Sequence, residues 1–169
     1  MKKLISFFAV IAASLGLAAG AQAGTTTSTL SVSATVSGIC TVSTTAVNFG
    51  DVTGLTDVLA NGDVTVNCAS GFPYNITLDA GLHYDGFMRT ISNGTDTRHY
   101  ALSSAFNPNP IDTESQWGDM GYADTFFGFG VADTGSGAAQ AHTVYGWLEP
   151  GVALPSGAYS DIVTVTVYY

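Results

Sequence analysis

The most constraining feature of this sequence is an unbroken alternation of apolar and small polar residues over residues 30–37. The apolar positions are Leu30, Val32, Ala34 and Val36. Serine or threonine follows each of them, and this two-residue period predicts a β-strand with one apolar face. Residues 24–29 ahead of it are small and polar, with nothing to bury. The pattern leaves two interpretations open: the strand begins its own domain, or it enters another molecule.

The first 23 residues have the three parts of a secretory signal peptide. Lys2 and Lys3 precede an apolar run over residues 4–19, which is short for a membrane span, and a small-x-small cleavage site ends at Ala23. Removal of 23 of the 169 residues leaves 146, enough for one domain with a real core. No later segment is apolar enough to span a bilayer, so we expect a soluble exported product without membrane insertion. The sequence thus divides into a signal peptide (1–23), a leader (24–37) and a domain (38–169).

The exported chain is strongly acidic. Both lysines lie in the signal peptide, so only Arg89 and Arg98 remain against 13 acidic residues, a formal net charge of −11. This balance argues against nucleic acid or an anionic membrane as a partner, because both require a basic face. Thr, Val, Tyr, Phe and Gly are plentiful and long helical patterns are missing, which predicts an all-β fold.

The two cysteines, Cys40 and Cys68, are predicted to form a disulfide, since the chain is exported. The bond would close a loop of roughly 28 residues and contribute ~3–4 kcal/mol on the loop-entropy estimate. A two-cysteine metal site is the alternative, but no histidine lies near either cysteine at ligand spacing.

Several short alternating segments separated by turns predict a β-sandwich. We expect extended segments near residues 38–42, 64–68, 74–79, 89–92, 99–103, 143–148 and 162–169. Asn61-Gly62 is a strong turn dipeptide, so a turn is expected before residue 64. A second turn is expected over residues 133–137, which carry two glycines.

The strongest strand pattern is the C-terminal one, with Val163, Val165 and Val167 on one side. These residues belong in a core, yet a terminal strand is often an edge, and edges pair readily with another chain. The alternating leader is the kind of segment that such an edge accepts by strand addition.

Catalytic and cofactor motifs are weak. Asp133-Thr134-Gly135 has the residues of an aspartic protease motif, but that chemistry needs two such aspartates and no second copy exists. The histidines show no metal-ligand spacing. Trp117 and Trp147 could stack on a sugar, although tryptophans in such strands more often pack in cores. We therefore expect no enzyme, cofactor or metal, and a self-contained secreted glycan-binding sandwich stays open as an alternative.

Taken in order, the motifs resemble the spore coat protein U domain family, which includes subunits of archaic chaperone–usher pili. The segments that carry the resemblance are 36–42 (VSGICTV), 48–50 (NFG), 64–68 (VTVNC), 100–102 (YAL), 117–119 (WGD), 144–146 (VYG) and 157–167 (GAYSDIVTVTV), with Arg89. The resemblance covers nearly the whole exported chain, and the order of the motifs is more specific than any one of them.

The resemblance implies an incomplete immunoglobulin-like sandwich that a donor strand from a neighbouring subunit completes. The donor side chains would be Leu30, Val32, Ala34 and Val36. The acceptor groove would be bordered by the edge strand with Val163, Val165 and Val167. Identical or related pilins would join head-to-tail in an extracellular surface fibre for adhesion and biofilm formation, after a periplasmic chaperone lends a strand and an outer-membrane usher exchanges it. A spore or cyst coat protein of the same fold is the alternative within the family.

Overall fold

The computed structural model describes residues 25–34, 39–52, 56–106, 116–151 and 153–169. The signal peptide expected over residues 1–23 and the donor position Val36 lie outside them. The chain forms two units, divided after Thr35, and each is described by itself. In the first, residues 25–34 are exposed and carry no regular secondary structure. The strand predicted from Leu30 is therefore unpaired over its described part.

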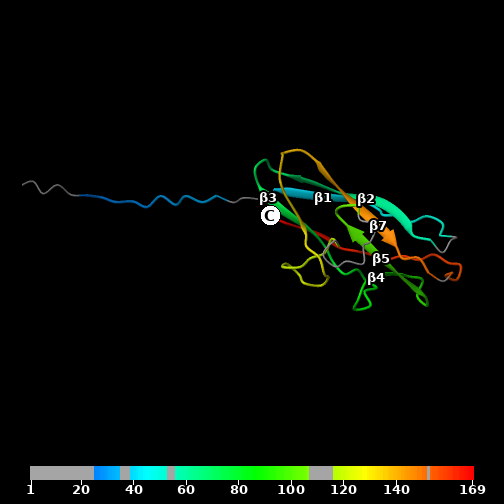
Figure 1. Ribbon diagram of the computed structural model, residues 1–169. Helices are drawn as coiled ribbons and strands as arrows, with labels where there is room; N and C mark the ends of the chain where they lie inside the picture. Colours follow the sequence, from blue (N-terminus) through cyan, green and yellow to red (C-terminus); the bar gives the residue numbers. More distant parts are fainter. Residues whose placement is uncertain (1–24, 35–38, 53–55, 107–115, 152) are drawn as a thin grey trace, which may run out of the picture. The chain divides into compact units, whose positions relative to one another are not determined.

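The second unit consists of two antiparallel sheets, and its described residues include no helix. Its strands are β1 (Cys40–Thr45), β2 (Val58–Cys68), β3 (Pro73–Leu78), β4 (Arg89–Ser92), β5 (Thr97–Ser103), β6 (Val131–Thr134), β7 (Gln140–Leu148) and β8 (Val165–Tyr168). The five-stranded sheet has the order β1-β2-β7-β5-β4, and the three-stranded sheet has the order β6-β3-β8. Figure 1 shows β1 running along β2, with which it pairs over its whole length.

The core forms where the apolar faces of the two sheets meet. Alternate residues at the end of β2 are buried, as two-residue periodicity requires, and the last three residues of β3 are all buried. The buried cluster comprises Val64, Val66, Cys68, Tyr74, Ile76, Leu78, Tyr100, Leu102, Trp117, Val144 and Leu148. Trp117 comes from a loop and donates its indole N–H to the carbonyl oxygen of Ile76 at 2.8 Å. Burial of this cluster is the main apolar contribution to the stability of the domain.

The disulfide predicted from the sequence joins Cys40 to Cys68. The two residues face each other in the register of β1 and β2, with their Cα atoms 4.1 Å apart. The bond fastens β1, an edge strand with mostly exposed residues, to the buried end of β2. The disulfide therefore helps to hold β1 in place, because the exposed residues of β1 contribute little apolar burial.

The turn expected at Asn61-Gly62-Asp63 is wrong, because these residues continue β2. They pair with residues 143–145 of β7, and the backbone N–H of Asp63 also donates to Thr45 Oγ1 at 2.8 Å. A Cβ atom on Gly62 would lie 2.6 Å from the carbonyl oxygen of Thr45. Pairing of Asn61 and Gly62 with β7 outweighs the local turn preference, and Gly62 allows close approach of the chain after β1.

Two other boundaries differ from expectation. The turn expected over residues 133–137 starts only at Gly135, since Asp133 and Thr134 pair with β3 in β6. The C-terminal strand expected from residue 162 starts at Val165. The preceding residues cross between the sheets: Ser160 exchanges two 3.0 Å backbone hydrogen bonds with Ser92 of β4, and β8 then pairs with β3.

Arg89 is fully buried, which the sequence did not indicate. Its guanidinium donates to the backbone carbonyl oxygens of Leu78, Asp79 and Trp117 at 3.0, 2.6 and 2.9 Å. It also lies 3.9 Å from the centre of the Phe126 ring, a cation–π contact. Burial lowers the pKa of Arg89 to about 10, so the side chain stays charged at neutral pH. One cation thus links β4 to the end of β3 and to the loop that carries Trp117.

We expect Arg89→Met to lower the free energy of unfolding by about 3 kcal/mol or more, because three buried carbonyl oxygens would lose a charged donor. Urea unfolding followed by tryptophan fluorescence measures this. The matched control is Arg98→Met, which removes the same charge from a half-buried position and should cost about 1 kcal/mol or less. Equal losses in the two variants would contradict a special role for Arg89.

Candidate functional site

A cavity of about 950 Å³, here called the groove, lies in the second unit above the apolar core. Its floor is formed by core residues of the five-stranded sheet, including Val64, Val144, Leu148, Leu102 and Tyr100. Two segments line its sides: residues 44–52, which follow β1, and the C-terminal residues 154–161 with Val163 and Val165. The groove therefore exposes part of the same core that the two sheets bury elsewhere.

The first side of the groove is set by Val47 and Phe49, which lie over Gly146 of β7. A Cβ atom on Gly146 would collide with Val47 and lie 3.2 Å from Phe49 Cζ. The ring of Phe49 also meets that of Tyr100 edge-on, with centroids 6.4 Å apart. Gly146 is thus required by close packing, and Phe49 narrows the groove beside Tyr100.

The second side of the groove is the C-terminal segment. β8 is the last strand of its sheet and, among the described strands, pairs only with β3. Val163 and Val165 line the groove, whereas Val167 packs on the core beyond it. Thr164 and Thr166 point the other way and are exposed. The sequence did not indicate which face of this segment borders a groove. The structure shows that it is the face with Val163 and Val165.

The polar end of the groove is formed by Asp161, whose side chain is 3% exposed. One carboxylate oxygen accepts a hydrogen bond from the Tyr100 hydroxyl at 2.6 Å. The other accepts from the backbone N–H groups of Leu82 and His83 at 3.0 and 3.2 Å and lies 2.9 Å from His83 Nδ1. Burial, together with Asp161, raises the pKa of the Tyr100 hydroxyl. The carboxylate is fully engaged, so it has a positioning role and not the reactivity of a catalytic acid.

The leader is described by itself. Leu30 and Val32 are 88% and 87% exposed, and Ala34 is exposed as well. Neighbouring aliphatic side chains that are this exposed often mark a surface that another protein covers. Their roles as donors, and those of Val163, Val165 and Val167 as acceptors, stay predictions.

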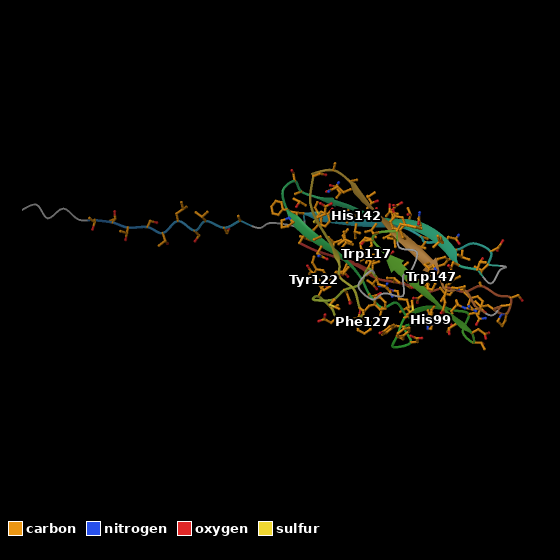
Figure 2. The ribbon with its side chains drawn as sticks, in the orientation of Figure 1. His99, Trp117, Tyr122, Phe127, His142 and Trp147 are labelled. Carbon is orange, nitrogen blue, oxygen red and sulfur yellow. A yellow bond between two sulfur atoms is a disulfide. The ribbon has the colours of Figure 1, made fainter. Side chains whose placement is uncertain are left out.

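The two tryptophans do not offer a sugar-binding surface. Trp117 and Trp147 are only 1% and 6% exposed, and Figure 2 shows Trp117 among the packed side chains of the domain. Trp147 packs with Met88 and Ala101 on the other face of the five-stranded sheet. The described residues also contain no group of three or more His, Cys, Asp or Glu residues that could hold a metal ion. The groove is thus the most distinctive candidate site.

The comparison with protein families gives a match over residues 26–166 to the spore coat protein U domain. The chain belongs to this family. The resemblance seen in the sequence is confirmed, and the match extends from the leader to β8.

Among solved structures, the chain resembles one chain of the CsuC–CsuE chaperone–tip adhesion subunit pre-assembly complex from the archaic chaperone–usher Csu pili of Acinetobacter baumannii. The TM-score is 0.53 at 21% identity, over 77% of this chain and 39% of that one. This chain therefore spans well under half the length of its structural neighbour. The likeness confirms the predicted all-β, immunoglobulin-like fold.

No curated protein matches the sequence closely, and no helix among the described residues is long and apolar enough to cross a membrane.

We expect Tyr100→Phe to destabilise the domain by about 1–3 kcal/mol, because the buried carboxylate of Asp161 would lose one of its donors. Thermal unfolding at constant pH measures the loss. Tyr122→Phe is the control: Tyr122 is exposed and its ring stacks on Tyr168, a contact that phenylalanine keeps. A change of less than about 0.5 kcal/mol is expected there. If Tyr100→Phe is equally mild, the hydroxyl does not hold Asp161 in place.

Proposed function

We propose that this protein is a structural subunit of an extracellular chaperone–usher pilus, polymerised when the leader of one copy enters the groove of the next. The observation that carries the proposal is the groove itself: an apolar cavity over the core, bordered by a β8 edge that pairs on one side only among the described strands. An added strand would supply hydrogen bonds to that edge and side chains to the cavity.

The leader has the properties that such a groove requires. Its apolar side chains alternate with serine and threonine, and residues 24–37 contain no charge. The groove is lined by Asp51, Asp63 and Asp161 as well as apolar residues, so a strand without charge on its inserted face avoids the repulsion that inserted carboxylates would meet. Burial of Leu30, Val32, Ala34 and Val36 would contribute about 5–8 kcal/mol before the costs of association, at ~1.5–3 kcal/mol for each larger side chain.

Ala34 is the smallest of the four donor side chains. In this proposal it would enter a shallow part of the groove.

Head-to-tail insertion is a heterologous contact that does not close, so it produces filaments. In this proposal residues 1–23 direct export, residues 24–37 donate the strand, and residues 38–169 form the accepting domain. A periplasmic chaperone would cover the groove before assembly and an outer-membrane usher would release the subunit into a surface fibre that serves adhesion and biofilm formation. The likeness to a subunit from a chaperone–subunit pre-assembly complex of Csu pili supports such a partner. The protein would act structurally and not as an enzyme. The family description also supports a spore or cyst coat built by the same polymerisation.

We expect Val32→Asp to abolish the ladder of multimers that unboiled SDS gel electrophoresis would show for the exported protein. A carboxylate on the apolar face of the leader would have to be buried without a partner. The matched control is Ser33→Asp, which places the same charge on the opposite face and should leave the ladder intact. A ladder that survives Val32→Asp, or is lost in both variants, would contradict insertion by this face.

The groove can be tested in the same way with Val163→Asp and its neighbour Thr164→Asp. Only the first introduces a charge into the groove. A Val163→Asp subunit can still donate its leader but should not accept one. Co-expressed with the wild type, it should therefore shorten the ladder, whereas Thr164→Asp should not. Unchanged ladders in both mixtures would show that this edge is not the acceptor.

A further inference from the structure

Each histidine of this chain lies against a carboxylate from another segment. His83 approaches Asp161 at 2.9 Å, and His142 approaches Asp133 at 3.6 Å. His99 lies between two carboxylates, Asp85 and Glu149. The chain has no lysine after residue 3 and Arg89 donates to backbone carbonyl oxygens, so the side chains that face these carboxylates are imidazoles. Charge that comes from histidine depends on pH in the range in which imidazole titrates.

His99 is the histidine that contacts two carboxylates, whereas each of the other two contacts one. Its Nε2 lies 2.6 Å from Asp85 Oδ2 and its Nδ1 lies 3.0 Å from Glu149 Oε2. A neutral imidazole has one N–H donor, so both contacts are hydrogen bonds only when the ring is protonated. Asp85 is itself fixed, because its other oxygen accepts from the backbone N–H groups of Phe87 and Met88 at 2.8 Å. Deprotonation of His99 therefore forces one of the two contacts to break.

The position of Glu149 connects this pair to the groove. Glu149 follows the end of β7, and the chain goes on from it to residues 154–161, which line the groove. We call residues 154–161 the rim. The far end of the rim is Asp161, which lies against His83. His83 can keep its Nδ1–H contact in the neutral form, whereas His99 cannot keep both of its contacts. His99 is thus the pH-sensitive attachment.

We propose that protonation of His99 fastens the rim of the groove to the body of the domain through Glu149, so that the rim is held at mildly acidic pH and loosened as the pH rises. This inference deepens the proposed function, since the groove would then accept or release a strand according to pH. The attachment itself is a property of the single subunit.

Two further contacts hold the backbone of Glu149 at any pH. Its N–H donates to the carbonyl oxygen of His99 at 3.0 Å, and Arg98 donates to its carbonyl oxygen at 3.5 Å, so protonation of His99 adds a side-chain attachment to this fixed point. The residue opposite His99 on β4 is the uncharged Thr90. The Phe87 ring lies edge-on, with centroids 6.2 Å apart. Burial acts to lower the pKa of His99, but hydrogen bonds and charge from Asp85 and Glu149 outweigh it and raise the pKa above its usual value. A histidine with a raised pKa in the folded state stabilises the fold below about pH 6.5, and this contribution is lost as the pH rises through the folded value.

Hydrogen exchange of the full exported chain tests the inference, with the rim amides as readout. Once the intrinsic pH dependence of exchange is divided out, we expect protection of residues 154–161 to fall about two- to fivefold between about pH 5.5 and about pH 8, the range of a partly exposed ion pair. In His99→Gln the protection should be low and independent of pH. Glu149→Gln, which leaves the histidine in place, should behave in the same way.

The matched control is His142→Gln, which removes an equivalent pair between β7 and β6. Figure 2 shows His142 and His99 in separate parts of the domain, so this variant should keep the pH response of the rim. A flat response in the wild type, or a fall retained in both His99→Gln and Glu149→Gln, would overturn the inference. A chain that shows the response but forms no ladder on an unboiled gel would support the pH-sensitive rim and refute the proposed polymerisation, so the two are tested separately.

Discussion

The C-terminal segment has to bond to both sheets, and much of the domain's architecture depends on that constraint. Ser160 pairs with β4 of the five-stranded sheet, and β8 pairs with β3 of the three-stranded sheet. Between them, the backbone oxygens of Ile162 and Thr164 accept hydrogen bonds from the N–H groups of Leu82 and Asp79. The backbone of the segment is thus hydrogen-bonded along its length, while the side chains of Val163 and Val165 line the groove. The core is shared by two sheets but left partly uncovered where the segment crosses.

The small number of basic residues determines many of the polar contacts. A chain with two arginines, no lysine after Lys3 and 13 acidic residues cannot rely on many surface ion pairs. It places one arginine in the interior, where Arg89 bonds three carbonyl oxygens, and sets its histidines against carboxylates. The carboxylate of Asp119 accepts from the backbone N–H groups of Thr125 and Phe126. Buried charge here mainly organises loops.

These features explain why the groove keeps its form. Its floor belongs to paired strands, its polar end is held by Asp161, and its first side rests on Gly146 through Val47 and Phe49. The most adjustable part is the segment from Glu149 to the end of the rim. Over most of its length this segment has no strand ladder, and the Glu149 side chain contacts His99. A rigid floor with an adjustable rim suits the strand insertion that we propose for this groove.

The sequence by itself determined the all-β class, the cysteine pair and the family, because two-residue periodicity, cysteine number and ordered motifs are local properties of the chain. It also indicated the apolar faces of the leader and of the C-terminal strand. It misjudged Asn61-Gly62, since pairing with β7 outweighs a turn preference. Only the tertiary structure decided that Arg89 is buried, that His99 joins Asp85 to Glu149, and that Val163 and Val165 face the groove. Those outcomes depend on contacts between residues far apart in the sequence, whose free energy exists only once both sheets have closed on one core.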